Sequence, residues 1–318
     1  MTLPTSAAPF ARDLAAPGRP RLSARVWSVL ADESTEAGYR RPFLLVHGLA
    51  SNARLWDGVA TRLAAAGYPV VAVDQRGHGL SDQPATGYDT DTCADDLVAI
   101  LDLLHWTGLR APVVAGQSWG GNVVLSLAAR YPAAVAAVCC VDGGWIRLAD
   151  RFADLESCWQ ALAPPVFDQI SYDDLADRIR QANPSWPPEG IEGTLANLVR
   201  TEDGGVRARL SREHHRSIVE SIYWGDPRAW YPAIDVPVLL CPAAAQAHSA
   251  PGSGDQGTDP DQQREAATRA AVVEALAALR HGQVHWYPGA DHDIHAEQPE
   301  AIAADLLALA RTSPGGPR

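Results

Sequence analysis

Short hydrophobic runs recur along the first half of the chain, and each is followed by a turn that contains glycine. Segments with the apolar spacing of amphipathic helices lie between these runs. Buried strands that alternate with helices form a mostly parallel sheet with right-handed crossovers, covered by helices on both faces. We therefore predict an α/β fold with an edge strand at 25–30, buried strands at 42–47, 68–74, 112–115 and 135–141, and helices at 56–66, 92–106 and 122–130.

The alternation stops near residue 145 and returns near residue 236. Between these points we find no clear buried strand, only patterns that predict helices at 151–163, 171–182, 190–200 and 211–222. After them we expect a strand at 236–241, a polar, glycine-rich loop at 246–261, a helix at 262–281, a strand at 283–287 and a helix at 299–311.

These patterns divide the chain into one core and one insertion. A length of 318 residues is long for one domain, but it fits a single α/β core that carries an inserted segment. We expect residues 22–144 and 233–312 to form the core and residues 145–232 to form a helical cap. Residues 1–21 and 313–318 are expected to be disordered tails.

Ser118 lies in the sequence Gly116-Gln117-Ser118-Trp119-Gly120, a G-x-S-x-G motif between a predicted strand and a predicted helix. A serine in such a sharp strand-to-helix turn has a strained backbone, and the flanking glycines allow the close backbone approach that the turn requires. The turn lifts the hydroxyl above the sheet, and the helix directs its N-terminal N–H groups toward negative charge that develops there. This context predicts a nucleophilic serine.

Composition excludes several kinds of chemistry. The 26 basic residues are all arginines, so chemistry that needs a lysine Schiff base is ruled out. The five cysteines form an odd number without a C-x-x-C pair, which favours buried, reduced thiols over a disulfide framework or a zinc site. Cys139 and Cys140 are neighbours in a predicted strand, so their side chains should point to opposite faces of the sheet.

Charge and hydropathy restrict the partners and the location. A net charge of −12 argues against nucleic acid and anionic membranes as partners. The first residues lack the pattern of a signal peptide, and no run approaches the roughly 18 apolar residues that a membrane-spanning helix needs. We expect a cytoplasmic monomer or homodimer that binds a small-molecule substrate.

A serine hydroxyl needs a base, and histidine is the natural choice because its ordinary pKa is near 6.5. His292 follows Gly289-Ala290-Asp291 in a loop between the last predicted strand and the last helix. In a parallel sheet that loop lies at the carboxyl edge, the same edge as Ser118. We therefore predict that His292 is the base.

These motifs together resemble the capped members of the α/β-hydrolase superfamily over residues 22–312. The matching segments are His47-Gly48, the Asp74-Gln-Arg-Gly-His-Gly-Leu-Ser81 turn, the Ser118 motif, and Gly289 to Pro299. The resemblance implies an oxyanion hole formed by the backbone N–H groups of Leu49 and Trp119, with no metal and no organic cofactor. It also implies that His47, Asp74, Arg76 and His78 are structural residues of their loops.

The acid that orients His292 departs from the commonest pattern of this superfamily. That pattern places an aspartate shortly after the strand at 236–241, where this chain has Pro242-Ala-Ala-Ala-Gln. Asp142, at the end of the strand that follows the Ser118 helix, is the preferred candidate because a strand end positions a carboxylate well. Asp255, Asp259 and Asp261, in the polar loop, are the alternative.

The expected activity is hydrolysis of a carboxylic ester or lactone, with amides as a further substrate class, through an acyl-enzyme on Ser118. Five tryptophans of the insertion suggest a bulky, largely apolar substrate, with Trp119 and Trp145 as pocket walls, although most of these rings are expected to pack the cap itself. Serine at position 118 argues against dehalogenase and ordinary epoxide hydrolase chemistry. The alternatives are a ligand-binding module with slow or no turnover, a C–C bond hydrolase and an acyltransferase.

Overall fold

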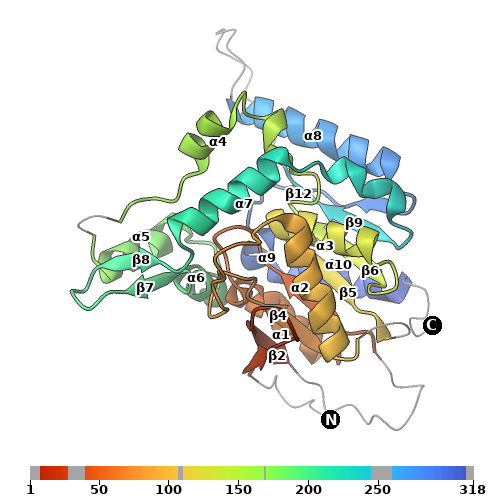
Figure 1. Cartoon of the computed structure of the whole chain (residues 1–318), viewed down its shortest axis with the longest axis horizontal. Coiled ribbons are helices and arrows are strands. Elements are labelled where there is room, and N and C mark those ends of the chain that lie inside the picture. Colours follow the sequence, from red (N-terminus) through yellow and green to blue (C-terminus); the bar gives the residue numbers. More distant parts are fainter. Residues whose placement is uncertain (1–7, 28–39, 107–109, 168–169, 245–259, 313–318) are drawn as a thin grey trace.

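The computed structural model describes residues 8–27, 40–106, 110–167, 170–244 and 260–312. Its main sheet has the strand order β1-β2-β4-β3-β5-β6-β9-β11 (Figure 1). The parallel strands are β4 (Val70–Val73), β3 (Phe43–Val46), β5 (Val113–Gln117), β6 (Ala137–Val141), β9 (Val238–Cys241) and β11 (Gly282–Val284). The predicted mostly parallel sheet is therefore confirmed.

The amino-terminal edge of the sheet corrects one expectation. Strand β1 (Phe10–Leu14) pairs antiparallel with β2 (Leu22–Trp27), and β2 pairs antiparallel with β4. A disordered tail over residues 1–21 is thus wrong for the segment that forms β1. Only Leu14 of this strand is buried, and Arg12 and Asp13 are polar, so the sequence lacks the hydrophobic pattern that would predict an edge strand here. Residues 1–7 and 313–318 lie outside the described part of the chain.

Helices cover both faces of the sheet. One face packs against α2 (Thr90–Leu103), α3 (Trp119–Arg130) and α8 (Pro260–Ala278), and the other packs against α1 (Asp57–Ala65) and α10 (Pro299–Thr312). Cys140 belongs to the first hydrophobic cluster and Cys139 to the second, so the predicted opposite orientation of these neighbours is confirmed. All five cysteines are buried free thiols, as the sequence predicted.

The segment between β6 and β9 adds no strand to the main sheet within the described residues. Its helices are α4 (Leu155–Leu162), α5 (Tyr172–Ala182), α6 (Pro188–Leu195) and α7 (Arg212–Trp224). The expected helix at 190–200 ends early, because β7 (Leu198–Arg200) and β8 (Val206–Ala208) form a small antiparallel hairpin. Gly204 makes the hairpin turn possible with a φ of +83°.

The hairpin and helices α5 and α6 project to one side of the sheet, at the left of Figure 1. Asn52, in the loop after β3, ties this part to the core. Its amide nitrogen donates to the carbonyl oxygen of Gly193 at 2.8 Å and to Asn197 Oδ1 at 2.6 Å. The loop after β3 is therefore anchored to the inserted segment as well as to the sheet.

Candidate active site

Ser118 occupies the turn between β5 and α3 with a φ of +54° and a ψ of −125°. A non-glycine residue in this region stores strain, on the order of 1–3 kcal/mol, that the surrounding structure must hold. A methyl group on Gly116 would lie 2.1 Å from the carbonyl oxygen of Gly120, so only glycine allows the helix to approach the strand this closely. The predicted strand–serine–helix turn is present in the fold.

Asp142 ends the neighbouring strand β6 and lies close to the serine turn. The backbone N–H of Ser118 donates to the carbonyl oxygen of Val141 at 2.9 Å. A methyl group on Gly143 would lie 2.1 Å from the Ser118 carbonyl oxygen. Asp142 has a φ of +42°, a left-handed conformation that aspartate tolerates better than most residues. The strand ends therefore bring the carboxylate to the same edge of the sheet as the hydroxyl.

His292 lies in the loop between β12 (Tyr287–Pro288) and α9 (Ile294–Glu297). Its Nδ1 is 2.5 Å from Asp142 Oδ2, a contact between residues 150 positions apart in the chain. Because a carboxylate only accepts, Nδ1 carries the proton and donates it. The structure thus brings Asp142 to His292. Asp255 and Asp259 lie outside the described residues, as does the side chain of Asp261.

The surroundings of His292 shift its titration. Burial lowers the pKa of this imidazole, but the hydrogen bond and negative charge of Asp142 outweigh that effect and raise the pKa above its ordinary value of 6.5. Burial is the largest single influence on this ring, and the hydrogen bond and charge of Asp142, with the charge of Asp293, together exceed it. The His292 side chain is 53% exposed to solvent. Water also has access to this ring.

The loop after β3 contains Leu49, whose backbone N–H is one of the two oxyanion donors implied by the family resemblance. His47 holds this loop: its Nε2 accepts from the Gln75 N–H at 2.9 Å, so its Nδ1 donates to the Gly48 carbonyl oxygen at 2.7 Å. Burial lowers the pKa of His47 to about 4, so this ring is neutral. His47 is a structural residue of the loop, as the sequence predicted.

His78 holds the next position of the same loop. Its Nε2 accepts from the Ala50 N–H at 3.2 Å, and its Nδ1 donates to the Arg76 carbonyl oxygen at 2.9 Å. Asp74 also serves the fold, because its two carboxylate oxygens accept from the N–H groups of Ala53 and Leu80. Because the His78 ring and the Asp74 carboxylate hydrogen-bond to the backbone, we assign them no role in acid–base chemistry.

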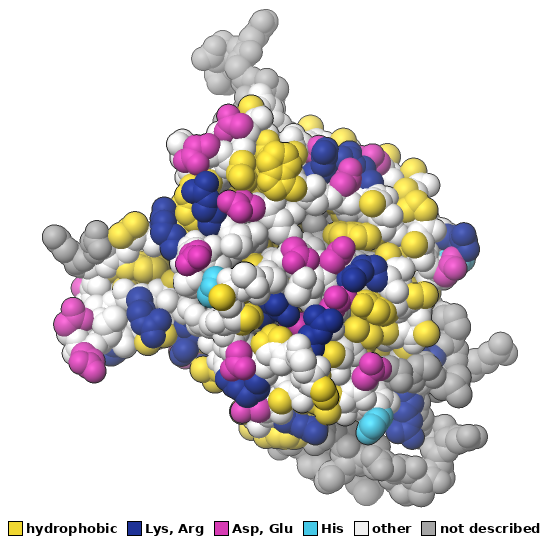
Figure 2. Space-filling model, viewed as in Figure 1, with side chains coloured by type: hydrophobic (Ala, Val, Ile, Leu, Met, Phe, Trp, Pro, Cys, Tyr) yellow, Lys and Arg dark blue, Asp and Glu magenta, His cyan; other side chains and the backbone are white. Residues whose placement is uncertain are grey.

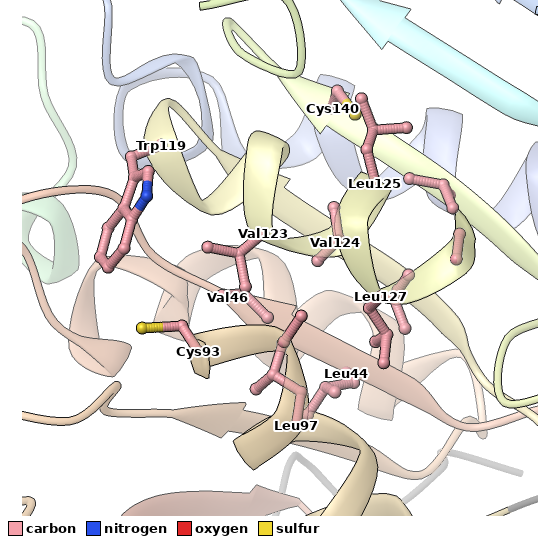
Figure 3. Packing of buried hydrophobic residues seen from close by; sticks show 14 of the residues in the cluster. Leu44, Val46, Cys93, Leu97, Trp119, Val123, Val124, Leu125, Leu127 and Cys140 are labelled. Carbon is pink, nitrogen blue, oxygen red and sulfur yellow. The ribbon is translucent and has the colours of Figure 1, made fainter. Parts of the chain in front are cut away.

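Trp119, the first residue of α3, carries the other backbone N–H that the family resemblance implies as an oxyanion donor, but its side chain corrects an expectation. The ring is 1% exposed, and its indole N–H donates to Thr90 Oγ1 at 3.0 Å. Figure 3 shows it among the buried side chains of the larger core cluster. Trp145 is 6% exposed and belongs to the same cluster. Both rings pack the interior, so neither forms the pocket wall that was expected.

Sequence reasoning missed two amides that organise this site. Gln117 donates from Nε2 to the His292 carbonyl oxygen at 3.2 Å. Asn122 Oδ1 accepts from the Gly144 N–H at 3.1 Å, and its Nδ2 donates to the Ile146 carbonyl oxygen at 2.7 Å, which holds the chain just after Asp142. Their only signal in the sequence is that a polar amide stands in an otherwise apolar run beside the serine motif.

Other features of the described residues add no second site. A hollow of about 680 Å³ is lined by Arg19, Arg76 and neighbouring residues, but both arginines are already paired with Asp95 or Asp96.

No three His, Cys, Asp or Glu side chains of the described part gather as metal ligands would. None of its helices has the length and apolar character to cross a membrane. On the face in Figure 2, acidic and basic side chains are interspersed.

Comparison with known proteins agrees with this geometry. A family model described as the alpha/beta hydrolase fold matches residues 41–188. A non-heme chloroperoxidase of Streptomyces lividans is 30% identical over 277 residues, which cover 85% of this chain and 92% of the relative. A non-heme haloperoxidase of Rhodococcus erythropolis is 28% identical over 296 residues, covering 88% and 98% of the two chains.

A solved structure of E-2-(acetamidomethylene)succinate hydrolase superposes with a TM-score of 0.69 at 22% identity, covering 95% of this chain and 98% of the other. A thioesterase domain from the curacin biosynthetic pathway gives a TM-score of 0.67 at 20% identity, over 95% and 100% of the two chains. At these identities the structures support the fold alone. From the sequence relatives and the shared architecture together, this chain belongs to the α/β-hydrolase superfamily, which supports a hydrolase activity.

Proposed function

We propose that this protein is a serine hydrolase that cleaves a carboxylic ester or lactone through an acyl-enzyme on Ser118. The observation that carries the proposal is the 2.5 Å contact between His292 Nδ1 and Asp142 Oδ2. A carboxylate on Nδ1 holds the tautomer in which Nε2 is an acceptor, and this is the nitrogen that a nucleophilic hydroxyl requires. The strained turn at Ser118 supports the same role, because it exposes the hydroxyl at the edge where Asp142 ends its strand.

The reaction has two balanced steps. In the first, Ser118 Oγ attacks the ester carbonyl carbon while His292 Nε2 takes the hydroxyl proton, and the same proton then passes to the departing alcohol oxygen. In the second, His292 takes a proton from water and the resulting hydroxide attacks the acyl carbon. His292 then returns the proton to Ser118 Oγ as that oxygen departs, and the carboxylic acid leaves. The N–H groups of Leu49 and Trp119 are proposed to bind the oxyanion in both steps. Each such donor typically contributes on the order of 10²–10³ in rate.

The inserted segment, residues 145–232, is proposed to act as a cap over the substrate. It begins directly after Asp142-Gly143-Gly144, and through Asn52 it is bonded to the loop that carries Leu49. A bulky, largely apolar substrate remains the proposal, although Trp119 and Trp145, which were expected to line its pocket, are packed in the protein interior. A panel of p-nitrophenyl esters with increasing acyl length tests it, and highest kcat/KM for acetate would contradict it.

The proposed nucleophile is tested by labelling and by substitution. We expect a fluorophosphonate probe to label Ser118, and we expect Ser118→Ala to abolish turnover of p-nitrophenyl esters while the melting temperature is preserved. Ser126→Ala is the matched control, since Ser126 lies on the same helix and its hydroxyl donates to Asp91 Oδ1. Folded protein that is neither labelled nor active would favour a ligand-binding module. If the probe labels Ser118 but the protein does not hydrolyse esters, amide hydrolysis, acyl transfer or C–C bond hydrolysis would be the activities to test next.

A second activity is favoured by two relatives that align over most of the chain, one named a non-heme chloroperoxidase and the other a non-heme haloperoxidase. We infer that hydrogen peroxide can replace water in the second step. Peroxide would then displace Ser118 Oγ from the acyl group and release a peroxy acid, an oxidant of halide ions. Bromination of a dye in the presence of peroxide, bromide and an acyl ester tests this activity. It should be lost in Ser118→Ala, and bromination that persists without an acyl donor would argue against this route.

A further inference from the structure

Gln117 is the last residue of β5 and directly precedes Ser118. Its side chain is 2% exposed, and its amide crosses to the loop that carries the proposed base. Nε2 donates to the carbonyl oxygen of His292 at 3.2 Å, between residues 175 positions apart in sequence. The main chain of the base is thereby bonded to the residue next to the nucleophile.

The other end of the same amide lies against the oxyanion loop. A methyl group on Gly48 would be 2.5 Å from Gln117 Oε1 and 2.8 Å from the Ser118 Cβ atom. Gly48 therefore leaves the space that the Gln117 amide fills. One buried, uncharged side chain thus touches the segments that carry the proposed nucleophile, oxyanion donor and base.

The side chain of the base has little other restraint. The His292 side chain is 53% exposed, so hydrophobic packing does not fix it. Asp293, which precedes α9, makes no side-chain hydrogen bond that caps this helix. Within the described residues, His292 itself makes two hydrogen bonds: its Nδ1 donates to Asp142, and its carbonyl oxygen accepts from Gln117. Without the Gln117 contact, the main chain of His292 would be held only through its neighbours. The Asp291 N–H donates to Glu297, and the Asp293 carbonyl oxygen accepts from N–H groups of α9.

We propose that Gln117 is a positioning residue that holds the His292 main chain in register with Ser118, an inference that rests on the proposed serine hydrolase mechanism. Gln117 does not reach the substrate and takes no proton. Its amide fixes where Nε2 of the imidazole lies relative to Oγ. A displacement of about 1 Å in such a pair typically costs on the order of 10²-fold in rate.

The test compares Gln117→Leu, which keeps the size but removes the donor, with Gln117→Glu, which turns an acceptor toward the His292 carbonyl oxygen. We expect kcat for a p-nitrophenyl ester to fall about 10- to 100-fold with KM within twofold, and Glu to be worse than Leu at neutral pH. Ser126→Ala again serves as the control, because it removes a buried hydrogen bond of α3 without touching these loops. It should leave kcat unchanged.

Two readouts separate positioning from mere stability. The downfield proton resonance of His292 Nδ1–H should shift or broaden in both Gln117 variants, and the rate of fluorophosphonate labelling at Ser118 should fall with kcat. Equal labelling rates and an unchanged resonance in folded Gln117→Leu would overturn the role of Gln117 while the serine mechanism stands. Unfolding of both variants would also overturn it, since Gln117 would then serve the fold. Absence of labelling in the wild-type protein would instead contradict the proposed function.

Discussion

The backbone N–H of Ala243 donates a hydrogen bond of 3.1 Å to Asp142 Oδ1. Ala243 follows β9, the position where the commonest α/β-hydrolase pattern would place its acidic residue. In this chain that position supplies a main-chain donor to a carboxylate that comes from the neighbouring strand β6. With Oδ1 held by Ala243 and Oδ2 by His292, the carboxylate has a fixed orientation at the edge of the sheet.

Asp142→Asn should therefore be strongly impaired. The amide cannot hold the required imidazole tautomer or stabilise the charged ring, and a comparable change in a serine protease lowers kcat by about 10⁴. We expect a fall in kcat on the order of 10²–10⁴ with little change in melting temperature, measured with a p-nitrophenyl ester.

Asp305→Asn is the matched control for this experiment. Asp305 Oδ2 lies 2.6 Å from His285 Nδ1 and also accepts from the Tyr287 hydroxyl. The substitution therefore removes a similar carboxylate–imidazole contact that involves neither Ser118 nor His292, and kcat should be unaffected. Asp255→Asn, Asp259→Asn and Asp261→Asn should also have little effect. If one of these loop variants is inactive while Asp142→Asn retains activity, the acid lies in the loop.

The pH dependence should follow the raised pKa of His292. The base acts when its imidazole is neutral, so kcat/KM should rise with pH through a midpoint above 6.5. Removing the Asp142 charge should move the midpoint of the residual activity to lower pH. The same raised pKa means that the protonated pair stabilises the fold at pH below 6.5, and this contribution is lost as pH rises through the His292 pKa. A midpoint below 6.5 in the wild-type profile would contradict this.

His295 should limit stability in acid. It is fully buried against Trp56, neither of its ring nitrogens has a partner among the described residues, and burial lowers its pKa to about 3. Below about pH 6.5 the unfolded chain binds a proton here that the folded chain does not, so stability falls as pH falls. His295→Phe should raise the melting temperature, most clearly near pH 5, because it removes unpaired polar atoms that typically cost about 1–3 kcal/mol. Equal or lower stability at that pH would count against this account.

Substitution of Gly116, in the serine turn, should be far more damaging to folding or activity than substitution of Gly204, in the hairpin turn. Gly116→Ala directs a methyl group at the main chain of Gly120, which cannot move without disrupting α3, so we expect loss of folded protein or of activity. Gly204, unlike Gly116, has a positive φ, but no atom lies within 4 Å of the added methyl group, so Gly204→Ala is expected to cost about 1 kcal/mol. Denaturant titration of both variants checks the difference, and similar losses would show that backbone conformation outweighs packing.

Much of the fold could be predicted because its signals are local. Hydrophobic runs and helical spacing depend on neighbouring residues, so the parallel strands, the α3 helix and the opposite orientation of Cys139 and Cys140 were anticipated correctly. The strand expected at the edge over 25–30 is β2 (Leu22–Trp27), which lies between β1 and β4. The β1 strand and the β7–β8 hairpin were missed because they are exposed and have weak hydrophobic patterns. Whether these segments form strands depends on the partner strand beside them, and the residues of a short exposed segment do not identify that partner.

By itself, the sequence determined the serine turn, since a strained residue between two glycines at a strand–helix junction is a matter of local sterics. It also placed His292 at the carboxyl edge, because parallel strands end together. The tertiary structure alone decided that Asp142 meets His292, that Gln117 bonds its main chain, and that Trp119 turns into the core. These are contacts between segments distant in the chain. Their geometry depends on the register of neighbouring strands and on side-chain packing, which no local pattern of residues encodes.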